Sequence, residues 1–370
     1  MPPKPGEFSV VDRIGQSRPV DLSIPYDPAW VCGKTILITG GAGGFGEGFL
    51  RTWAAHGAQV IIGDVSVERG DRLIRDVRKD TGNDDLHFLH CDVVDWDSQV
   101  TFFKEAIRLS NHGGIDVVVA NAGVPDKPPF FEEPEGIRND TQPVKPNLTT
   151  IDVNLTGVLY TAHLALFYLP RNPSSDPVDR ASTPSSSKPR DRHLLLLGSI
   201  ASLTCLPGQA LYGVSKHGVL GLFRSLRGTS FVHGVRVNML CPYFIDTPII
   251  SPSGRHLLAG LTMGKVEDVV DAGTRFVADT RIIGRSLVVG PKLRIEEDED
   301  GEFILLDPSS VKGKETAVWE AYAEDYETCD IFVRRIIGLF ATAAKVRGWT
   351  GFIAATVAAM LYGLKGLFRR

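Results

Sequence analysis

The stretch KTILITGGAGGFGEGF, residues 34–49, decides the fold of this chain. An apolar run typical of a buried strand comes first, and a cluster of glycines then leads into the start of a helix. Gly40, Gly44 and Gly46 stand where a backbone turns tightly to approach a pyrophosphate, with the free N–H groups of a helix N-terminus behind them. We therefore predict a dinucleotide site that includes Phe45; the alternative is that the glycines serve only a tight loop.

Six more apolar runs follow, and amphipathic stretches separate them. The runs span residues 59–64, 86–93, 116–123, 193–199, 235–242 and 285–291. Helical spacing is found over 46–57, 67–80, 97–110, 148–169 and 211–232. Continuous Val, Ile and Leu runs are typical of parallel strands covered on both faces. Together with the first run, they predict an α/β chain: a doubly wound Rossmann fold with a seven-stranded parallel sheet.

Shifts in composition predict how the chain is divided. An N-terminal arm covers residues 1–33, the Rossmann domain 34–291 and a C-terminal extension 292–370. Residues 171–192, rich in Ser, Pro and charge, have almost nothing to bury and predict a disordered insertion. Residues 248–280 combine loop residues with apolar anchors, so we expect a mobile substrate lid, with packing of a short helix as the alternative.

The C-terminal tail ends in an apolar segment. Residues 348–364 carry no charge, and a helix of that length spans roughly 25 Å, a little short of a ~30 Å hydrocarbon core. Just upstream, residues 331–340 are apolar with a basic doublet, as in helices that lie in a membrane interface. Three interpretations remain open: a helical tail that anchors the chain in a membrane, one that lies on the membrane surface, and one that packs against protein.

Composition narrows the class of protein. With 370 residues, a net charge of −4 and 43% hydrophobic residues, the chain is neither wholly disordered nor a multi-span membrane protein. The charge gives no reason to expect a nucleic-acid partner. The five cysteines contain no CxxC pair, so we expect neither a disulfide scaffold nor a metal site. The start, MPPKPGEFSVVDR, lacks the apolar run of a secretory signal, and a cytoplasmic location is expected.

An acidic residue ends the second apolar run and points to the cofactor. Asp64 lies about 20 residues after the glycines, where a carboxylate can accept both ribose hydroxyls of NAD. It would repel the 2′-phosphate of NADP, and neither Val65 nor Ser66 is basic. We therefore predict NAD rather than NADP. The alternative role for Asp64 is that of a turn residue at the end of a strand.

Three more residues follow predicted strands on the cofactor side. Asp92 could reach the adenine amino group, although it suits turn capping nearly as well. Asn121 could hold strand carbonyls, and Gly123 leaves room for the cofactor, while a plain strand-terminating turn would explain both.

The pair of Tyr212 and Lys216 in YGVSK predicts the chemistry. Residues four apart lie on one helix face, and a nearby ammonium stabilises a phenolate. Such a tyrosine can exchange a proton with an alcohol or ketone oxygen during hydride transfer. Ser199 ends the fifth run and could hold the reacting oxygen, a role for which Ser202 is less suited. Asn154 lies on the long helix before that run, where its amide could hold a relay water near Lys216 or be satisfied by backbone.

These motifs resemble those of the short-chain dehydrogenase/reductase family over roughly residues 34–291. TGGAGGFG fits its glycine motif, and NAG, the helix Asn, the Ser and the Tyr–Lys pair have counterparts. The resemblance implies that Tyr212 is the acid/base, that Ser199 orients the substrate oxygen and that Asn154 supports a proton relay. It also implies that Lys216 binds the nicotinamide ribose and lowers the pKa of the tyrosine.

The stretch CPYFIDTP, 241–248, resembles the segment that contacts the carboxamide in this family. The resemblance implies cofactor contacts from Ile245 and Thr247. Tyr243 stands where the family has glycine.

Residues 208–222 resemble the branch that contains 15-hydroxyprostaglandin dehydrogenase and its fungal relatives. That resemblance implies an apolar hydroxylated substrate and a contact from Gln209, which as a residue is equally suited to a polar surface. We expect an NAD-dependent oxidoreductase that interconverts a secondary alcohol and a ketone on a lipophilic small molecule, in specialised metabolism. The alternatives are an NADPH-dependent ketoreductase and a catalytically silent, membrane-tethered scaffold. Family members usually pair through two long helices, which implies a homodimer or homotetramer.

Overall fold

The computed structural model describes residues 14–126, 145–178, 190–297 and 303–346, with gaps. The gaps within these ranges are positions 205, 230, 231, 233, 248, 249, 251–254, 257, 261, 324, 326–331 and 344.

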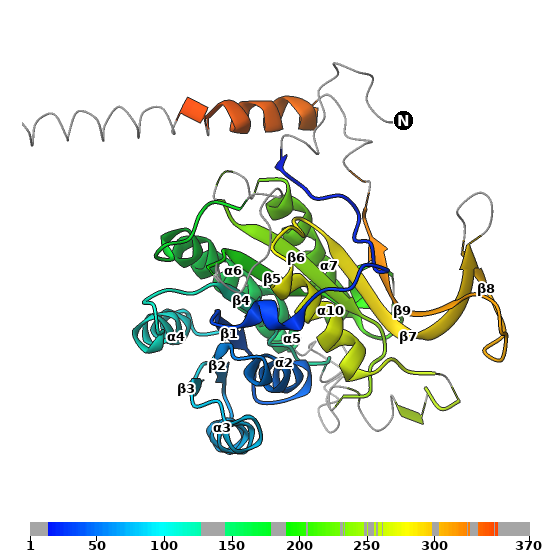
Figure 1. The fold of residues 1–370 in the computed structure, drawn as a ribbon, viewed down its shortest axis with the longest axis horizontal. Helices are drawn as coiled ribbons and strands as arrows, with labels where there is room; N and C mark the ends of the chain where they lie inside the picture. The colour runs from blue at the N-terminus through cyan, green and yellow to red at the C-terminus, as the bar shows by residue number, and fades with distance from the viewer. Residues whose placement is uncertain are drawn as a thin grey trace, which may run out of the picture.

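One twisted sheet runs through the molecule (Figure 1). Its strands lie in the order β3-β2-β1-β4-β5-β6-β7-β8, and β9 pairs with β7. The strands are β1 Thr35–Thr39, β2 Gln59–Asp64, β3 Leu86–His90, β4 Val117–Ala120, β5 His193–Leu197, β6 Arg236–Pro242, β7 Ser286–Glu297, β8 Phe303–Leu305 and β9 Lys314–Ala321. The first six pairings, from β3 across to β7, are all parallel. The parallel Rossmann sheet predicted from the apolar runs is thus present.

All seven predicted parallel strands are present, but seven is too low a count for the whole sheet, which has nine strands within the described residues. Strand β7 continues past 291 to Glu297, and both β8 and β9 pair with it antiparallel. These added strands lie at the edge of the sheet, where every residue of β8 is exposed. Strand β8 has only three residues, too short a run to mark a strand, and β9 has the mixed sequence KETAVWEA, because antiparallel strands need no apolar residues on both faces.

Helices cover both faces of the sheet. One face packs against α2 Gly44–Ala55, α3 Val67–Thr81 and α10 Val266–Ala278, and the other against α4 Trp96–Leu109, α6 Gly157–Tyr168 and α7 Ala210–Arg227. Helix α6 continues from a short turn, α5 Thr149–Ile151, through a π-helical turn, η2 Asp152–Thr156. Short 3₁₀ turns are η1 Pro28–Val31, η3 Leu169–Arg171 and η4 Ile200–Ser202.

The part of the N-terminal arm within the structure packs on the core (Figure 1). Ile14 and Gln16 are almost fully buried, and the Gln16 amide donates to the Gly284 carbonyl at 3.1 Å. Further along, the Tyr26 hydroxyl donates to an Asp271 carboxylate oxygen at 2.7 Å. These contacts hold the arm beside α10 and the loop before β7.

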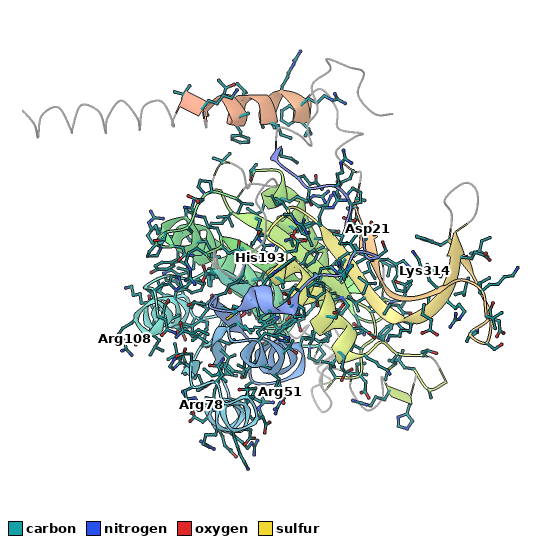
Figure 2. All side chains as sticks on the ribbon, viewed as in Figure 1. Asp21, Arg51, Arg78, Arg108, His193 and Lys314 are labelled. Carbon is teal, nitrogen blue, oxygen red and sulfur yellow. The ribbon has the colours of Figure 1, made fainter. Side chains whose placement is uncertain are left out.

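Both ends of the predicted disordered insertion are ordered, and residues 179–189 lie outside the part described. Asp191 is buried, and its Oδ2 lies 2.7 Å from Lys34 Nζ and 2.7 Å from Arg236 Nη2. Asn172 donates to Asp116 at 2.8 Å in the same network, beside His193, which Figure 2 shows near the centre of the molecule. The prediction over 171–192 is too wide, because charges that suggested solvent exposure are paired inside the core.

The segment expected as a lid, 248–280, ends in a core helix. Helix α10 occupies residues 266–278, and Val269 and Phe276 are fully buried in the core beneath it. The Trp53 indole of α2 also donates to the Thr274 hydroxyl at 2.9 Å. Helix packing, the alternative weighed for this segment, therefore holds for its second half.

The C-terminal tail is described only in part. A helix covers 332–343, and its buried Ile337 packs against Ile14. The predicted apolar segment 348–364 lies outside the described residues. Within the part of the chain that is described, no helix is both long and apolar enough to cross a bilayer.

Candidate active site

The glycine-rich turn after β1 is built as a close-approach loop. Gly40 has φ +63°, and a Cβ there would lie 2.6 Å from Ala122 Cα; a Cβ on Gly46 would lie 2.6 Å from the Gly40 carbonyl oxygen. By contrast, a Cβ on Gly43 or Gly44 would meet nothing within 4 Å. Helix α2 begins at Gly44, and no side chain caps its N-terminus. Bare backbone donors at a helix start fit a pyrophosphate.

Two neighbours complete this turn. Phe45 is half-buried against the core that contains α2. Gly41, which the sequence reasoning missed, has no room for a side chain, because a Cβ there would lie 2.4 Å from Ile62 Cβ. The doubled glycine in TGGAGG was the signal that could have found it.

Asp64 ends β2 beside the glycine turn, as predicted. Its Oδ2 accepts from the Ala42 N–H at 3.1 Å, and its Oδ1 accepts from the Ser66 N–H at 3.0 Å. The carboxylate thus ties the turn to the end of β2 and also acts as a turn residue. The nearby cation is Arg69, whose Nε donates to the Ser66 hydroxyl at 3.0 Å.

Asp92 and Asn121 follow the neighbouring strands. Asp92 Oδ1 accepts from the Val94 N–H at 3.1 Å, which is the turn-capping arrangement weighed as the alternative for this residue. Asn121 Nδ2 donates to the carbonyls of Thr39 and Gly40, at 3.1 and 2.8 Å. Asn121 therefore holds the end of β1 and the first glycine of the turn, as expected of a residue that pins strand carbonyls.

Asn154 lies in the π-helical turn η2 and is fully buried. Its Oδ1 accepts from the Val124 N–H at 2.7 Å, and its Nδ2 donates to the Val124 carbonyl at 2.8 Å. A Cβ on Gly123 would lie 3.4 Å from Asn154 Oδ1 and 3.9 Å from Lys216 Nζ. Gly123, Asn154 and Lys216 thus meet at one place. π-Turns inside helices are frequent at functional sites.

Ser199 caps the turn that follows β5. Its hydroxyl oxygen accepts from the Ala201 N–H at 3.1 Å, while Ser202 Oγ accepts from the Ser199 N–H at 3.1 Å. Ser202 is fully buried and completes a capping box, which gives it a structural task. A hydroxyl carries one donor as well as its acceptors, so the Ser199 O–H can still be directed at another oxygen.

Tyr212 and Lys216 lie on the same helix, α7. Lys216 Nζ lies 5.7 Å from the centre of the Tyr212 ring and donates to the Leu197 carbonyl at 3.0 Å. Burial lowers the pKa of the Lys216 ammonium to about 8. That ammonium is therefore held at the end of β5, next to Ser199.

The phenol itself has a raised pKa. Burial is the main cause, the hydrogen bond with the Ser199 side chain offsets part of it, and the groups of Asp126 and Cys241 add to it. The protein groups together thus shift the Tyr212 pKa upward, whereas the resemblance implied that Lys216 lowers it. The physical reason is that desolvation of the phenolate outweighs the stabilising contacts.

Two residues beside Tyr212 were missed by the sequence reasoning. Asp126 follows NAG by three residues, and its charge reaches the phenol. The Cys241 thiol is fully buried, and burial raises its pKa to about 12. Neither residue type forms a motif at this spacing, so only the tertiary structure brings them to the site.

The remaining predicted contacts lie on two other segments. Gln209 is exposed at the start of α7 and its side chain caps nothing. Ile245 and Thr247 are buried after β6, where Ile245 bridges to Gly264. Tyr243, which replaces a family glycine, does not have a positive φ, so this backbone does not require glycine.

Known proteins are similar to this chain along much of its length. The family model for short chain dehydrogenases matches residues 34–257. The chain is 34% identical to 5′-hydroxyaverantin dehydrogenase of Dothistroma septosporum over 76% of this chain and 92% of that protein. It is 34% identical to the NADP-dependent dehydrogenase M3 of a Phoma species over 75% of this chain and 80% of that protein. With mouse 15-hydroxyprostaglandin dehydrogenase [NAD(+)] it shares 24% identity over 82% of this chain and 97% of that protein.

The glycine turn, the side chains at the ends of β2, β4 and β5, and the Tyr–Lys pair on α7 lie within the matched region. The family model spans most of the Rossmann sheet, and the relatives align along most of their own length. The chain belongs to the short-chain dehydrogenase/reductase family, as an NAD(P)-dependent enzyme that acts on alcohols or ketones.

Proposed function

We propose that this protein is an NAD-dependent dehydrogenase that oxidises a secondary alcohol of a lipophilic small molecule to a ketone. The observation that carries the proposal is the convergence of four side chains. Ser199 lowers the pKa of the Tyr212 phenol, Lys216 lies one helical turn further along α7, and Asn154 meets Lys216 across Gly123. The same family membership favours an enzyme over a silent scaffold.

Each side chain has a distinct task in this mechanism. The nicotinamide, when bound, supplies the hydride acceptor. The Tyr212 phenolate accepts the hydroxyl proton of the substrate, and Ser199 donates to the same oxygen and holds it. Lys216 keeps two donors beyond its bond to Leu197, one of which can hold the cofactor ribose. Asn154 fixes the loop that faces these groups and would keep a water near Lys216.

The protein residues fit a dinucleotide. Bare backbone at Gly43 and Gly44 and the uncapped start of α2 suit the pyrophosphate. Asp64 suits the ribose hydroxyls of NAD, and Asp92, Asn121, Ile245 and Thr247 would line the remaining length. The second candidate is an NADPH-dependent ketoreductase, favoured by Arg69 close to Ser66 and by the NADP-dependent relative. We propose that Asp64 repels a 2′-phosphate more strongly than the exposed Arg69 attracts it.

The proposal is tested by following NADH absorbance with wild-type protein and a panel of lipophilic secondary alcohols, which includes terpenoids, polyketides and steroids. We expect oxidation with NAD and the loss of turnover, with NAD binding retained, in Tyr212→Phe. Unchanged turnover in Tyr212→Phe would contradict the mechanism. Turnover only with NADPH and ketones would favour the second candidate.

We also infer a homodimer that pairs through α6 and α7. Three apolar side chains are exposed on these helices: Leu159 and Phe167 on α6, and Val214 on α7, which is 60% exposed. Sedimentation of the wild-type chain and of Val214→Glu tests this inference. A monomeric wild-type protein would contradict it.

We propose in addition that the tail contacts a membrane. The helix at 332–343 exposes Phe332, Leu339 and Phe340 beside the basic Arg335. Apolar side chains with nearby cations suit a membrane interface. Cell fractionation of the full chain and of a variant lacking 331–370 tests this. If both distribute identically, the tail is not the attachment.

A further inference from the structure

Asp126, at the end of the described stretch that follows β4, is a carboxylate with no hydrogen-bond donor among the described residues. Both carboxylate oxygens of Asp126 are shielded from solvent, although the residue as a whole is half-buried, and in the described part of the chain neither oxygen has a hydrogen-bond partner. Within the described ranges no ion pair joins Asp126 to a Lys, Arg or His. An ionised carboxylate only accepts hydrogen bonds, so the group that is missing here is a donor.

Contacts with the long helix fix the position of this carboxylate. Asn154 bonds to Val124 in both directions, and the Pro125 carbonyl accepts from the Thr150 hydroxyl at 3.3 Å. Asp126 is the next residue. Its charge raises the pKa of the Tyr212 phenol, so the carboxylate lies within electrostatic reach of the reacting group.

The two oxygens of Asp126 are shielded from water and have no donor among the described residues in its place. Removing a charge from water without a compensating hydrogen bond is strongly unfavourable. The same charge also disfavours the phenolate form of Tyr212. A ligand that brings a hydrogen-bond donor to Asp126 would supply the missing partner. It would also weaken the effect of the carboxylate on the phenolate of Tyr212. This makes the carboxylate suited to recognise a ligand.

We propose that Asp126 binds a second hydroxyl group of the substrate, one that is not oxidised, and so makes the enzyme selective for diols and other multiply hydroxylated alcohols. This inference rests on the proposed function, because it presumes that an alcohol oxygen lies at Tyr212. A site that hydrogen-bonds a substrate hydroxyl discriminates strongly against the analogue that lacks it, because the protein group is then left unpaired.

Matched probes test the selectivity. The first set is decan-2-ol, decane-2,4-diol and 4-aminodecan-2-ol; the second is 4-phenylbutan-2-ol and 4-(4-hydroxyphenyl)butan-2-ol, whose added hydroxyl lies further away. We expect wild-type kcat/KM for the hydroxylated member of at least one set to exceed that of its parent by about tenfold or more. The ratio of kcat/KM for the hydroxylated probe to kcat/KM for its parent should fall toward one in Asp126→Ala. It should fall less in Asp126→Asn, whose amide oxygen still accepts a hydrogen bond.

Two results in this assay would overturn the proposal. One is a hydroxyl preference that Asp126→Ala leaves unchanged. The other is a preference for the amine over both the diol and the parent, which would assign Asp126 to an ammonium group instead.

A second measurement does not depend on turnover. In the full chain without cofactor, Asp126→Asn and Asp126→Ala should raise Tm by about 1–3 °C, because each removes an unpaired buried charge. The control is Asp95→Ala, which should lower Tm, since Asp95 caps α4 by accepting from the N–H groups of Asp97 and Ser98. A lower Tm in both Asp126 variants would show that the carboxylate already has a donor and would overturn the inference. If no probe is oxidised but Tm rises, the proposed function fails and the unpaired carboxylate stands.

Discussion

The Asn154 side chain and the Val124 backbone exchange two hydrogen bonds, one in each direction, at 2.7 and 2.8 Å. An amide is required for this, because one atom accepts while the other donates. The pair ties the π-helical turn η2 to the loop after β4. It therefore holds Gly123 next to Lys216 and holds Asp126 near Tyr212.

Asn154→Asp should reduce both stability and turnover. A carboxylate cannot donate to the Val124 carbonyl, which is left unsatisfied, so we expect a loss of about 1–3 kcal/mol in the free energy of unfolding. Urea denaturation and NADH absorbance measure the two effects. The matched control is Asn147→Asp: exposed Asn147 uses only its oxygen, which accepts from Thr149, and the substitution keeps that acceptor. Equal stabilities of the two variants would contradict the assignment.

The rate of alcohol oxidation should rise with pH. Burial raises the pKa of Tyr212, so at neutral pH only a small fraction of the phenol is ionised and able to accept a proton. The groups that face it are Ser199, Asp126, Cys241 and Lys216, and burial lowers the Lys216 pKa to about 8. We expect kcat/KM for oxidation to increase about tenfold per pH unit below the Tyr212 pKa.

Ketone reduction should show the opposite dependence, with a rate that falls as pH rises through the Tyr212 pKa, since the phenol must then donate. Asp126→Asn removes a charge that raises this pKa, so it should move both curves to lower pH. Oxidation that slows as pH rises from neutrality would argue against a tyrosine base.

Asp64→Ser should change the preference between the two cofactors. The substitution removes the negative charge that would repel a 2′-phosphate and leaves Arg69, which donates to the Ser66 hydroxyl, as a nearby cation. We expect the ratio of NAD to NADP affinity to fall at least about tenfold, which corresponds to ~1.4 kcal/mol. The control is Asp71→Asn, an exposed acid on α3. The ratio is the readout, because Asp64 also supports the Ala42 N–H and its loss can weaken both cofactors.

Asp191→Asn should destabilise the fold strongly. Burial alone would raise the pKa of Asp191, but the charges of Arg236 and Lys34 outweigh it and hold the pKa well below its usual range. The substitution leaves two buried cations unpaired, at a cost of about 3–5 kcal/mol. Urea denaturation at pH 7 measures this against Asp80→Asn, whose exposed ion pair with Arg51 should contribute little.

Acid should weaken the contribution of Asp191 to the stability of the fold, because folding lowers the pKa of this carboxyl. Asp191 stabilises the fold fully above its unfolded pKa, near 3.9, and this contribution is lost as pH falls toward the folded value. Wild-type stability should therefore decline more steeply in acid than that of Asp191→Asn.

Continuous apolar runs predicted strands β1 to β7 and that they run parallel, because strands buried on both faces show this pattern locally. The glycine turn, Asp64, Asn121 and the Tyr212–Lys216 pair were also readable, since each occupies a defined place after a strand or on one helix face. Strands β8 and β9 were not found, because β8 has only three residues and β9, an antiparallel strand of mixed sequence, has no continuous apolar run.

The local sequence pattern thus predicted the parallel sheet and the residues at the ends of its strands, because side-chain periodicity and turn preferences involve only a few neighbouring positions. Packing between distant segments decided the rest. Lys34 meets Asp191 across 157 residues of chain, and Asn154 meets Val124 across 30. Whether a carboxylate such as Asp126 has a hydrogen-bond donor depends on every group around it in space. A missing donor can therefore be recognised only in the folded chain.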